Sequence, residues 1–156
     1  MLKITILSVG KIKESYYQDI IDEYLKRLLP YARVDFEVIK PEPFYDNSDK
    51  EGIKNKEGEK IVGFLDKNKG GRVFVMDERG REFTSGEFSG KLHSGTEPIV
   101  FVIGGSLGLS QDVLNYPGAQ KIALSKMTFL HEMTQVILME QIYRAVAIDK
   151  GKKYHY

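Results

Sequence analysis

Five consecutive apolar residues, Ile99 to Ile103, run directly into the glycine-rich segment Gly104-Gly-Ser-Leu-Gly108. A short run without a polar position indicates a strand that is covered on both faces, which is typical of the centre of a parallel sheet. In an open α/β sheet, the turns that follow such strands gather at one edge, and ligands bind there. The run therefore predicts an α/β fold with a ligand site beside the glycine-rich turn.

The rest of the chain supplies the strands and helices that such a sheet needs. We predict further strands over 2–9, 34–39, 72–76 and 121–124 from their β-branched and apolar runs. Apolar residues at helical spacing predict helices over 16–29, 85–92 and 128–148, and a further helix that ends near Lys67. The charged region from Asp46 to Lys60 contains Gly52 and Gly58, and we interpret it as a loop leading into that helix. Asp77-Glu-Arg-Gly80 is expected to turn the chain.

Length and composition favour one domain over residues 1–156. The chain has 156 residues, of which 42% are apolar, and this is enough for one buried core. The net charge is only +1, so any contact with RNA must come from a local basic patch. The chain has no cysteine, which excludes disulfides and thiolate zinc sites, and we expect a cytoplasmic protein. The apolar run from Ile4 to Val9 is too short for a membrane span, so no membrane association is predicted.

The predicted helix over 128–148 is apolar around most of its circumference. Such a helix requires burial on two sides. It could lie at the centre of the core, but a second subunit would cover the outer face of a small domain more easily. We therefore predict a homodimer.

The glycine-rich segment allows several interpretations. A dinucleotide-binding motif is excluded because Ile103 stands where its first glycine is required, and a P-loop is excluded because no Gly-Lys-Ser/Thr follows Gly108. The segment does match the G-x-S-x-G pattern of serine hydrolases, with Ser106 as nucleophile and Asp149 and His155 downstream. A tight exit from the strand, without any chemistry, is a further interpretation.

The three histidines, His93, His131 and His155, do not show the spacing of a metal site, and no metal is predicted. His131 is either a core or capping residue or a functional one. The segment from Gly151 to Tyr156 places lysines beside aromatic rings, which suits phosphate contact and base stacking. Arg144 strengthens this interpretation because a guanidinium can bind phosphate or stabilise a developing anion.

Several segments, taken in order, resemble one known family. These are Ile4-Thr-Ile-Leu-Ser-Val-Gly-Lys11, Phe101-Val-Ile-Gly-Gly105 with Gly108-Leu109, Leu124-Ser-Lys-Met-Thr128 with His131, Glu140-Gln-Ile-Tyr-Arg-Ala145, and Tyr154-His155. Together they resemble the RlmH family of SPOUT-class ribosomal RNA methyltransferases. The resemblance implies a homodimeric α/β domain with a carboxy-terminal trefoil knot and S-adenosylmethionine as methyl donor. It implies N3 of a pseudouridine in large-subunit (23S) ribosomal RNA as acceptor, and we expect the assembled ribosome to be the substrate.

The resemblance also implies the site residues. The donor pocket would comprise Met76, Asp77, Gly104, Gly105, Gly108, Leu124, Ser125, Lys126, Met127, Thr128, Phe129 and Leu130. Lys126 is expected to point away and to contribute its backbone, because a cation would repel the sulfonium of the donor. The catalytic set would comprise His131, Arg144, Tyr154 and His155. His131 would orient the target base or accept its proton, Arg144 would stabilise the deprotonated ring or a phosphate, and Tyr154 with His155 would position the nucleotide.

Three residues depart from the family pattern. Leu130 replaces the usual proline before the histidine, Gln135 stands where an arginine is common, and Tyr156 replaces a terminal basic residue. Loss of the proline removes a fixed φ from the donor loop, and the other two changes remove cations from the expected RNA face. A noncatalytic ribosome-binding or RNA-binding module is therefore a further alternative.

Overall fold

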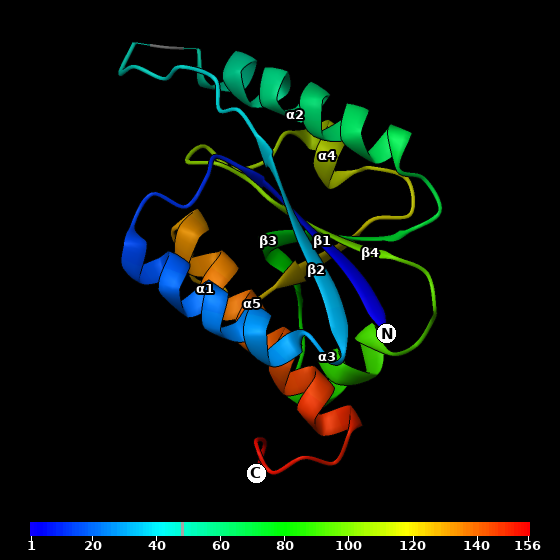
Figure 1. Ribbon diagram of the computed structural model, residues 1–156. Coiled ribbons are helices and arrows are strands. Elements are labelled where there is room, and N and C mark those ends of the chain that lie inside the picture. Colours follow the sequence, from blue (N-terminus) through cyan, green and yellow to red (C-terminus); the bar gives the residue numbers. More distant parts are fainter. Residues whose placement is uncertain (48) are drawn as a thin grey trace.

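A five-stranded parallel sheet divides the structure into two layers of helices (Figure 1). The computed structural model describes residues 1–47 and 49–156. The strands are β1 (Leu2–Val9), β2 (Ala32–Ile39), β3 (Arg72–Glu82), β4 (Ile99–Ile103) and β5 (Gln120–Ala123), in the order β2-β1-β4-β3-β5. This arrangement confirms the predicted α/β fold with a parallel central sheet. The knotted course of the chain stays a prediction.

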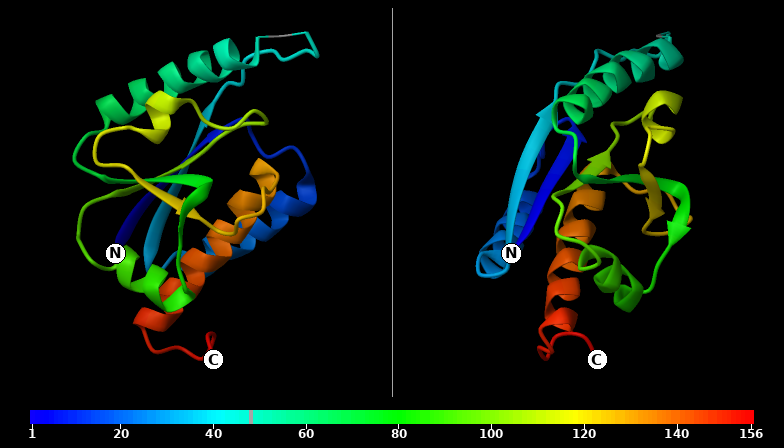
Figure 2. Two further views of the ribbon diagram at one scale, coloured as in Figure 1. Left: turned by 180° about the vertical axis from the view of Figure 1, so that it is seen from behind. Right: turned by 90° about the vertical axis from the view of Figure 1, so that its right-hand side faces the viewer.

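The helices cover the two faces of the sheet (Figure 2). On one face α1 (Ser15–Leu28), α3 (Ser85–Leu92) and α5 (His131–Asp149) form a core with inward side chains of β1 and β4. On the other face α2 (Lys50–Lys67) and α4 (Gln111–Leu114) pack over a second core. The alternation of side chains along β1 explains this division, because Ile4 and Ile6 enter the first core while Leu7 and Val9 enter the second.

Strand β4 lies at the centre of the sheet, as its sequence predicts. All five of its residues are buried, and it pairs with β1 on one side and β3 on the other. Its carboxyl end therefore opens between two neighbouring strands, which is where the glycine-rich turn begins.

The prediction of a loop over Asp46 to Lys60 is wrong for most of that region, because α2 begins at Lys50. Ser48 lies outside the described residues. The Asp49 side chain accepts a hydrogen bond from the Gly52 backbone N–H at 3.1 Å and so caps the helix. Gly58 lies inside the helix, where its lack of a side chain allows close packing: a Cβ there would overlap the Ser110 side chain.

The predicted turn over Asp77 to Gly80 is also wrong. Strand β3 continues through these residues to Glu82, and its register with β5 shifts between Met76 and Arg81. Extra residues on one strand at such an irregularity bend the strand without ending it. Met76 and Asp77 therefore lie within β3, at the irregularity, and not at its end.

Much of the apolar surface of α5 is covered within one chain. The helix packs against α1 and α3, and its residues Leu138, Met139 and Ile142 are fully buried. Met133, Val136 and Ile137, nearer the start of the helix, are only half-buried. No helix in the described part of the chain is long and apolar enough to span a membrane.

Gly63→Ala is expected to stabilise the protein. Gly63 lies inside α2, and a Cβ there would meet no atom within 4 Å. Alanine removes conformational freedom from the unfolded chain, so the free energy of unfolding should rise by about 0.5–1 kcal/mol. Urea unfolding followed by circular dichroism measures this change, and an unchanged or lower midpoint would contradict the packing described for α2.

Candidate active site

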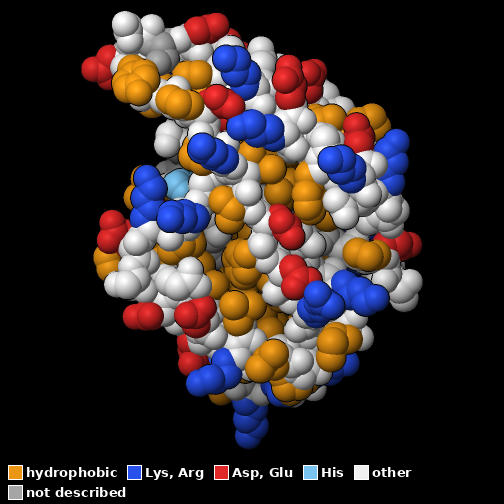
Figure 3. Space-filling model, turned by 45° about the horizontal axis from the view of Figure 1, so that its top comes forward, with side chains coloured by type: hydrophobic (Ala, Val, Ile, Leu, Met, Phe, Trp, Pro, Cys, Tyr) orange, Lys and Arg blue, Asp and Glu red, His pale blue; other side chains and the backbone are white. Residues whose placement is uncertain are grey.

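A pocket of about 510 Å³ lies at the carboxyl edge of the sheet, beside the ends of β4 and β5 and the start of α5. Its volume falls in the range of small-molecule sites. Seen with the top of the molecule brought forward, apolar side chains occupy the middle of this face and Lys and Arg side chains lie around them (Figure 3). Eleven of the twelve predicted donor-site residues line the pocket: Met76, Asp77, Gly104, Gly105, Gly108, Leu124, Ser125, Met127, Thr128, Phe129 and Leu130.

Lys126, the twelfth residue, is exposed and does not line the pocket. No other Lys or Arg lines it either. The described pocket thus holds no ammonium or guanidinium that would repel a cationic ligand.

The glycine-rich turn forms one wall of the pocket, and its glycines are required sterically. A Cβ on Gly104 would lie 2.9 Å from Leu109 Cγ and 3.1 Å from the backbone carbon of Gly108. Gly108 has φ +82°, a conformation that side chains disfavour, and its N–H donates to the Gly105 carbonyl at 3.1 Å. At its three glycines the turn therefore presents backbone to the pocket, while Ser106 and Leu107 also line it.

The segment from Leu124 to Leu130 forms the opposite wall. Ser125 Oγ accepts a hydrogen bond from the Met127 N–H at 3.1 Å, which curls the segment. Leu130 has φ −56°, close to the angle that proline imposes, so its backbone here matches the residue that the family pattern favours. Met127 and Leu130 are more than 70% exposed and leave an apolar rim.

Asp77 supplies a carboxylate in the wall formed by β3. Both of its oxygens accept hydrogen bonds from the Arg79 guanidinium at 2.9 Å, and its side chain is only 7% exposed. The hydrogen bonds from Arg79 hold the pKa of Asp77 below its usual range, against the effect of burial. Asp77 is therefore an anionic acceptor at neutral pH.

His131 begins α5 and lines the same pocket. Its Nε2 is buried, has no hydrogen-bond partner among the described residues, and lies 3.6 Å from the position of a Cβ on Gly10. The next residue, Glu132, accepts hydrogen bonds from the backbone N–H groups of Lys13 and Glu14 at 3.1 and 3.4 Å. These bonds fix the start of α5 against the β1–α1 connection.

The other three predicted catalytic residues form a separate cluster at the far end of α5. Arg144 donates two hydrogen bonds to Glu140, at 2.6 and 3.1 Å, and its guanidinium lies 4.8 Å from the centre of the Tyr154 ring. The bonds to Glu140 raise the pKa of Arg144, so it stays charged. Arg144 Nη1 also contacts His155 Nδ1 at 3.3 Å. Because a guanidinium can only donate, Nδ1 accepts in this pair and the proton lies on Nε2.

Tyr154 connects this cluster to α1. Its hydroxyl oxygen lies 3.2 Å from the Tyr24 hydroxyl oxygen, and it donates a hydrogen bond to Glu140 Oε1 at 3.2 Å. Burial, the hydrogen bond with Tyr24 and the charge of Glu140 raise the pKa of Tyr154, so the phenol stays neutral. The phenol is thus a hydrogen-bond donor and not a base.

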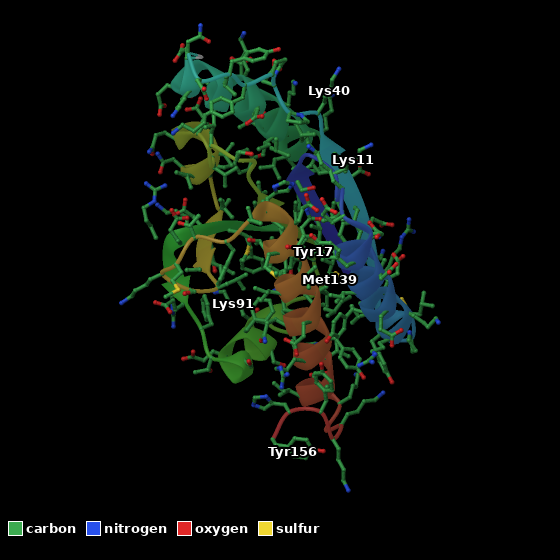
Figure 4. All side chains as sticks on the ribbon, turned by 90° about the vertical axis from the view of Figure 1, so that its left-hand side faces the viewer. Lys11, Tyr17, Lys40, Lys91, Met139 and Tyr156 are labelled. Atoms are coloured by element: carbon green, nitrogen blue, oxygen red, sulfur yellow. The ribbon has the colours of Figure 1, made fainter. Side chains whose placement is uncertain are left out.

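The two groups of residues are separated within one chain. Arg144 lies thirteen positions after His131 in α5, which is about 20 Å along a helix axis. The carboxy-terminal segment leaves α5 at the end opposite to His131 (Figures 1 and 2). Figure 4 likewise shows Tyr156 at one end of the molecule and Lys11 and Lys40 at the other.

This separation also excludes the serine hydrolase interpretation of the glycine-rich segment. Ser106 lines the pocket, whereas Asp149 pairs with His93 at 3.7 Å and His155 contacts Arg144, both near the far end of α5. Asp149 and His155 therefore do not form with Ser106 the hydrogen-bonded relay that a serine hydrolase requires.

Sequence reasoning missed several residues of both groups. Leu107 and Thr134 line the pocket, and Thr134 could have been found because it follows His131 by three positions on one helix face. Glu140 could have been found as the acidic residue four positions before Arg144. Tyr24 could not, because it reaches the cluster only through the packing of α1 on α5. The described residues hold no cluster of three or more His, Cys, Asp or Glu side chains suited to a metal.

Comparisons with known proteins agree with this geometry. A family model described as "Predicted SPOUT methyltransferase" matches residues 2–155. Proteins named ribosomal RNA large subunit methyltransferase H, from Symbiobacterium thermophilum and Clostridium beijerinckii, are 44% and 45% identical over 99% of this chain and 99% of their own length. A solved structure from Bacillus anthracis shares the fold, with a TM-score of 0.54 at 19% identity over 98% of this chain and 97% of that one. The chain belongs to the RlmH family of SPOUT methyltransferases.

Proposed function

We propose that this protein methylates N3 of a pseudouridine in large-subunit ribosomal RNA, with S-adenosylmethionine as methyl donor. The observation that carries the proposal is the pocket that gathers the glycine-rich turn, the segment from Leu124 to Leu130 and His131 around one cavity. The names of the relatives support ribosomal RNA as the substrate. The donor supplies an activated methyl group on a sulfonium when it is bound.

The residues of the pocket suit this donor. The glycine-rich turn lets backbone groups approach a flat adenine or a ribose closely, and Leu124, Met127 and Leu130 offer apolar surface. Asp77 can accept hydrogen bonds from hydroxyl or ammonium groups because it is anionic. The absence of Lys and Arg from the described lining allows a sulfonium to bind without repulsion.

We further propose that the active unit is a homodimer. The His131 pocket and the Arg144 cluster are about 20 Å apart along α5, too far to act on one base. A two-fold partner can place the Arg144 cluster of one subunit beside the pocket of the other. The exposed apolar residues Phe129 and Leu130, together with half-buried Met133 and Ile137, offer the surface for such contact.

In this arrangement, each group has a distinct task. N3 must lose its proton as it gains the methyl group, and an anion develops on the ring. The Arg144 guanidinium, which is charged and held by Glu140, can stabilise that anion. His131 can accept the N3 proton or orient the target base. Neutral Tyr154, which already donates to Glu140, can position the nucleotide by accepting a hydrogen bond or through its ring.

Calorimetric titration with S-adenosylmethionine is the first test of this function. We expect saturable binding with a Kd in the micromolar range, about −8 kcal/mol. One site per chain would mean that each pocket binds alone, and one site per two chains would mean that binding requires both subunits. Absence of heat at any concentration would remove the methyltransferase proposal and favour the noncatalytic module.

Assembled ribosomes and free 23S RNA are the next acceptors to compare. The chain carries a net charge of only +1, so broad electrostatic attraction to free RNA is weak. Lys11, Lys13 and Lys40 are exposed near the carboxyl edge of the sheet and can supply a local phosphate contact. We expect transfer of labelled methyl to ribosomes and little to free RNA.

A further inference from the structure

Glu57 is a buried carboxylate beneath the glycine-rich turn, and it has no part in the proposed methyl transfer. It lies in α2 and is only 6% exposed, whereas its neighbour Glu59 is exposed. Burial raises the pKa of Glu57, the nearby Glu42 carboxylate adds to this effect, and the Glu42 backbone N–H and the Lys60 ammonium oppose it. A buried carboxylate lowers stability unless its contacts compensate, so its position requires a reason.

The contacts of Glu57 connect two segments that are distant in sequence. Its Oε2 accepts a hydrogen bond from the Glu42 backbone N–H at 3.0 Å. Its Oε1 lies 3.7 Å from the position that a Cβ on Gly105 would occupy, so the carboxylate lies directly against the glycine-rich turn. Lys60, one helical turn further, donates to the Lys40 carbonyl at 3.1 Å and to Glu42 Oε1 at 2.7 Å.

The residue after Glu57 packs against the chain just after the same turn. Gly58 packs so closely on Ser110 that a Cβ at position 58 would overlap the serine side chain. Ser110 precedes α4 and is buried. The pair Glu57-Gly58 therefore lies against the turn near its start, at Gly105, and against the chain two residues past its end, at Ser110.

We propose that Glu57 is a positioning residue for donor binding: its carboxylate, held by the backbone N–H of Glu42, packs against the glycine-rich turn of the pocket and restricts its conformation. The inference rests on the proposed function only for the identity of the donor. A turn made of three glycines has more conformational freedom than other loops, and a ligand that must order it binds more weakly. Glu57 reduces that freedom from outside the pocket, because Glu57 itself does not line the cavity.

The test compares Glu57→Ala with Glu57→Gln and with the matched control Glu59→Ala. Glu57→Ala should weaken S-adenosylmethionine binding about tenfold in calorimetry, because the donor must then order the turn. In ribosome assays its KM for the donor should rise while kcat at saturating donor stays near that of the parent protein. Glu57→Gln keeps an acceptor for the Glu42 N–H and should lose no more than about threefold. Glu59→Ala should match the parent protein.

Nuclear magnetic resonance of the ligand-free protein tests the contact independently of the donor. The amide signals of Gly105 and Gly108 should shift in Glu57→Ala and stay in place in Glu59→Ala, while the signal of Gly90, in α3 on the other face of the sheet, stays in place in both. A folded Glu57→Ala protein with unchanged donor affinity overturns the inference, and so does an equal loss in Glu59→Ala.

If Glu57→Ala does not fold, Glu57→Gln is the deciding variant. Its altered charge beside Gly105 must still shift the Gly105 amide signal. An unchanged Gly105 signal overturns the inference. If the parent protein does not bind the donor, the proposed function fails, whereas the glycine amide shifts still report on the role of Glu57.

Discussion

Replacing Arg144 with alanine is expected to abolish most methyl transfer while leaving donor binding unchanged. Arg144 lies far from the pocket in its own chain, and in the proposed dimer it acts on the target base and not on the donor, so the affinity for S-adenosylmethionine should not depend on its side chain. Loss of a charged donor that stabilises a developing anion reduces kcat by roughly 10²–10³-fold. Transfer of labelled methyl to ribosomes measures the loss, and calorimetry measures donor binding.

Two further variants distinguish chemistry from folding. Arg144→Lys keeps the charge but not the paired hydrogen bonds to Glu140, so its rate should lie between those of the parent protein and Arg144→Ala. Arg33→Ala removes an exposed arginine on β2 that pairs with Asp35, and it should leave the rate unchanged. Full activity of Arg144→Ala would remove this residue from the mechanism.

Mixing two inactive proteins tests whether the site spans two subunits. Gly104→Ala should distort the glycine-rich wall of the pocket and prevent donor binding, because its Cβ would lie 2.9 Å from Leu109 Cγ. When Gly104→Ala and Arg144→Ala subunits exchange at equal amounts, half of the dimers are mixed and each carries one intact composite site, so about a quarter of the activity should return. A mixture that stays inactive, although subunit exchange is shown by mass, would contradict the composite site.

Gly80→Ala is expected to cause the largest loss of stability among single alanine substitutions at the described glycines. A Cβ at this position would lie 2.6 Å from the backbone carbon of Lys121 and 2.7 Å from the nitrogen of Ile122. These are backbone atoms of β5, so the side chain cannot be accommodated without separating β3 from β5. Overpacking of this kind lowers the free energy of unfolding by about 3 kcal/mol, or roughly 10 °C in Tm for a domain of this size.

The consequence of Gly80→Ala should reach the pocket as well. The segment from Leu124 to Leu130 follows β5 directly, so displacement of β5 should weaken donor binding in any protein that still folds. Gly90→Ala is the control, because a Cβ on this helical glycine meets nothing within 4 Å. Thermal unfolding by calorimetry compares the two, and equal Tm values would contradict the close approach of β3 and β5.

The local patterns of the sequence predicted most of the secondary structure. The apolar run from Ile99 to Ile103 indicated a buried central strand, and β4 has these same bounds at the centre of the sheet. The prediction over 85–92 also matches α3, whose start is fixed by a reciprocal pair of hydrogen bonds between Thr84 and Glu87. In both cases the informative pattern, an unbroken apolar run or a pair of capping residues, lies within a few residues, so it can be recognised locally.

The patterns misled where a glycine serves a distant contact. Gly52 and Gly58 suggested a loop, yet Gly58 is small because α2 packs on Ser110. Gly80 suggested a turn, yet it is small because β3 passes close to the backbone of β5. In both places the partner lies tens of residues away, and only the packed chain shows which role the glycine has.

The residues of the site, like the secondary structure, could be predicted from the sequence only in part. The sequence by itself determined the family, through segments spread along the whole chain, and with it the residues of the glycine-rich turn and of the segment from Leu124 to Leu130. Only the tertiary structure showed that these residues enclose one cavity, that His131 shares it, and that Arg144 lies about 20 Å away along α5. The physical reason is that strand order and helix packing fix distances between segments, and the chemistry of a site depends on those distances.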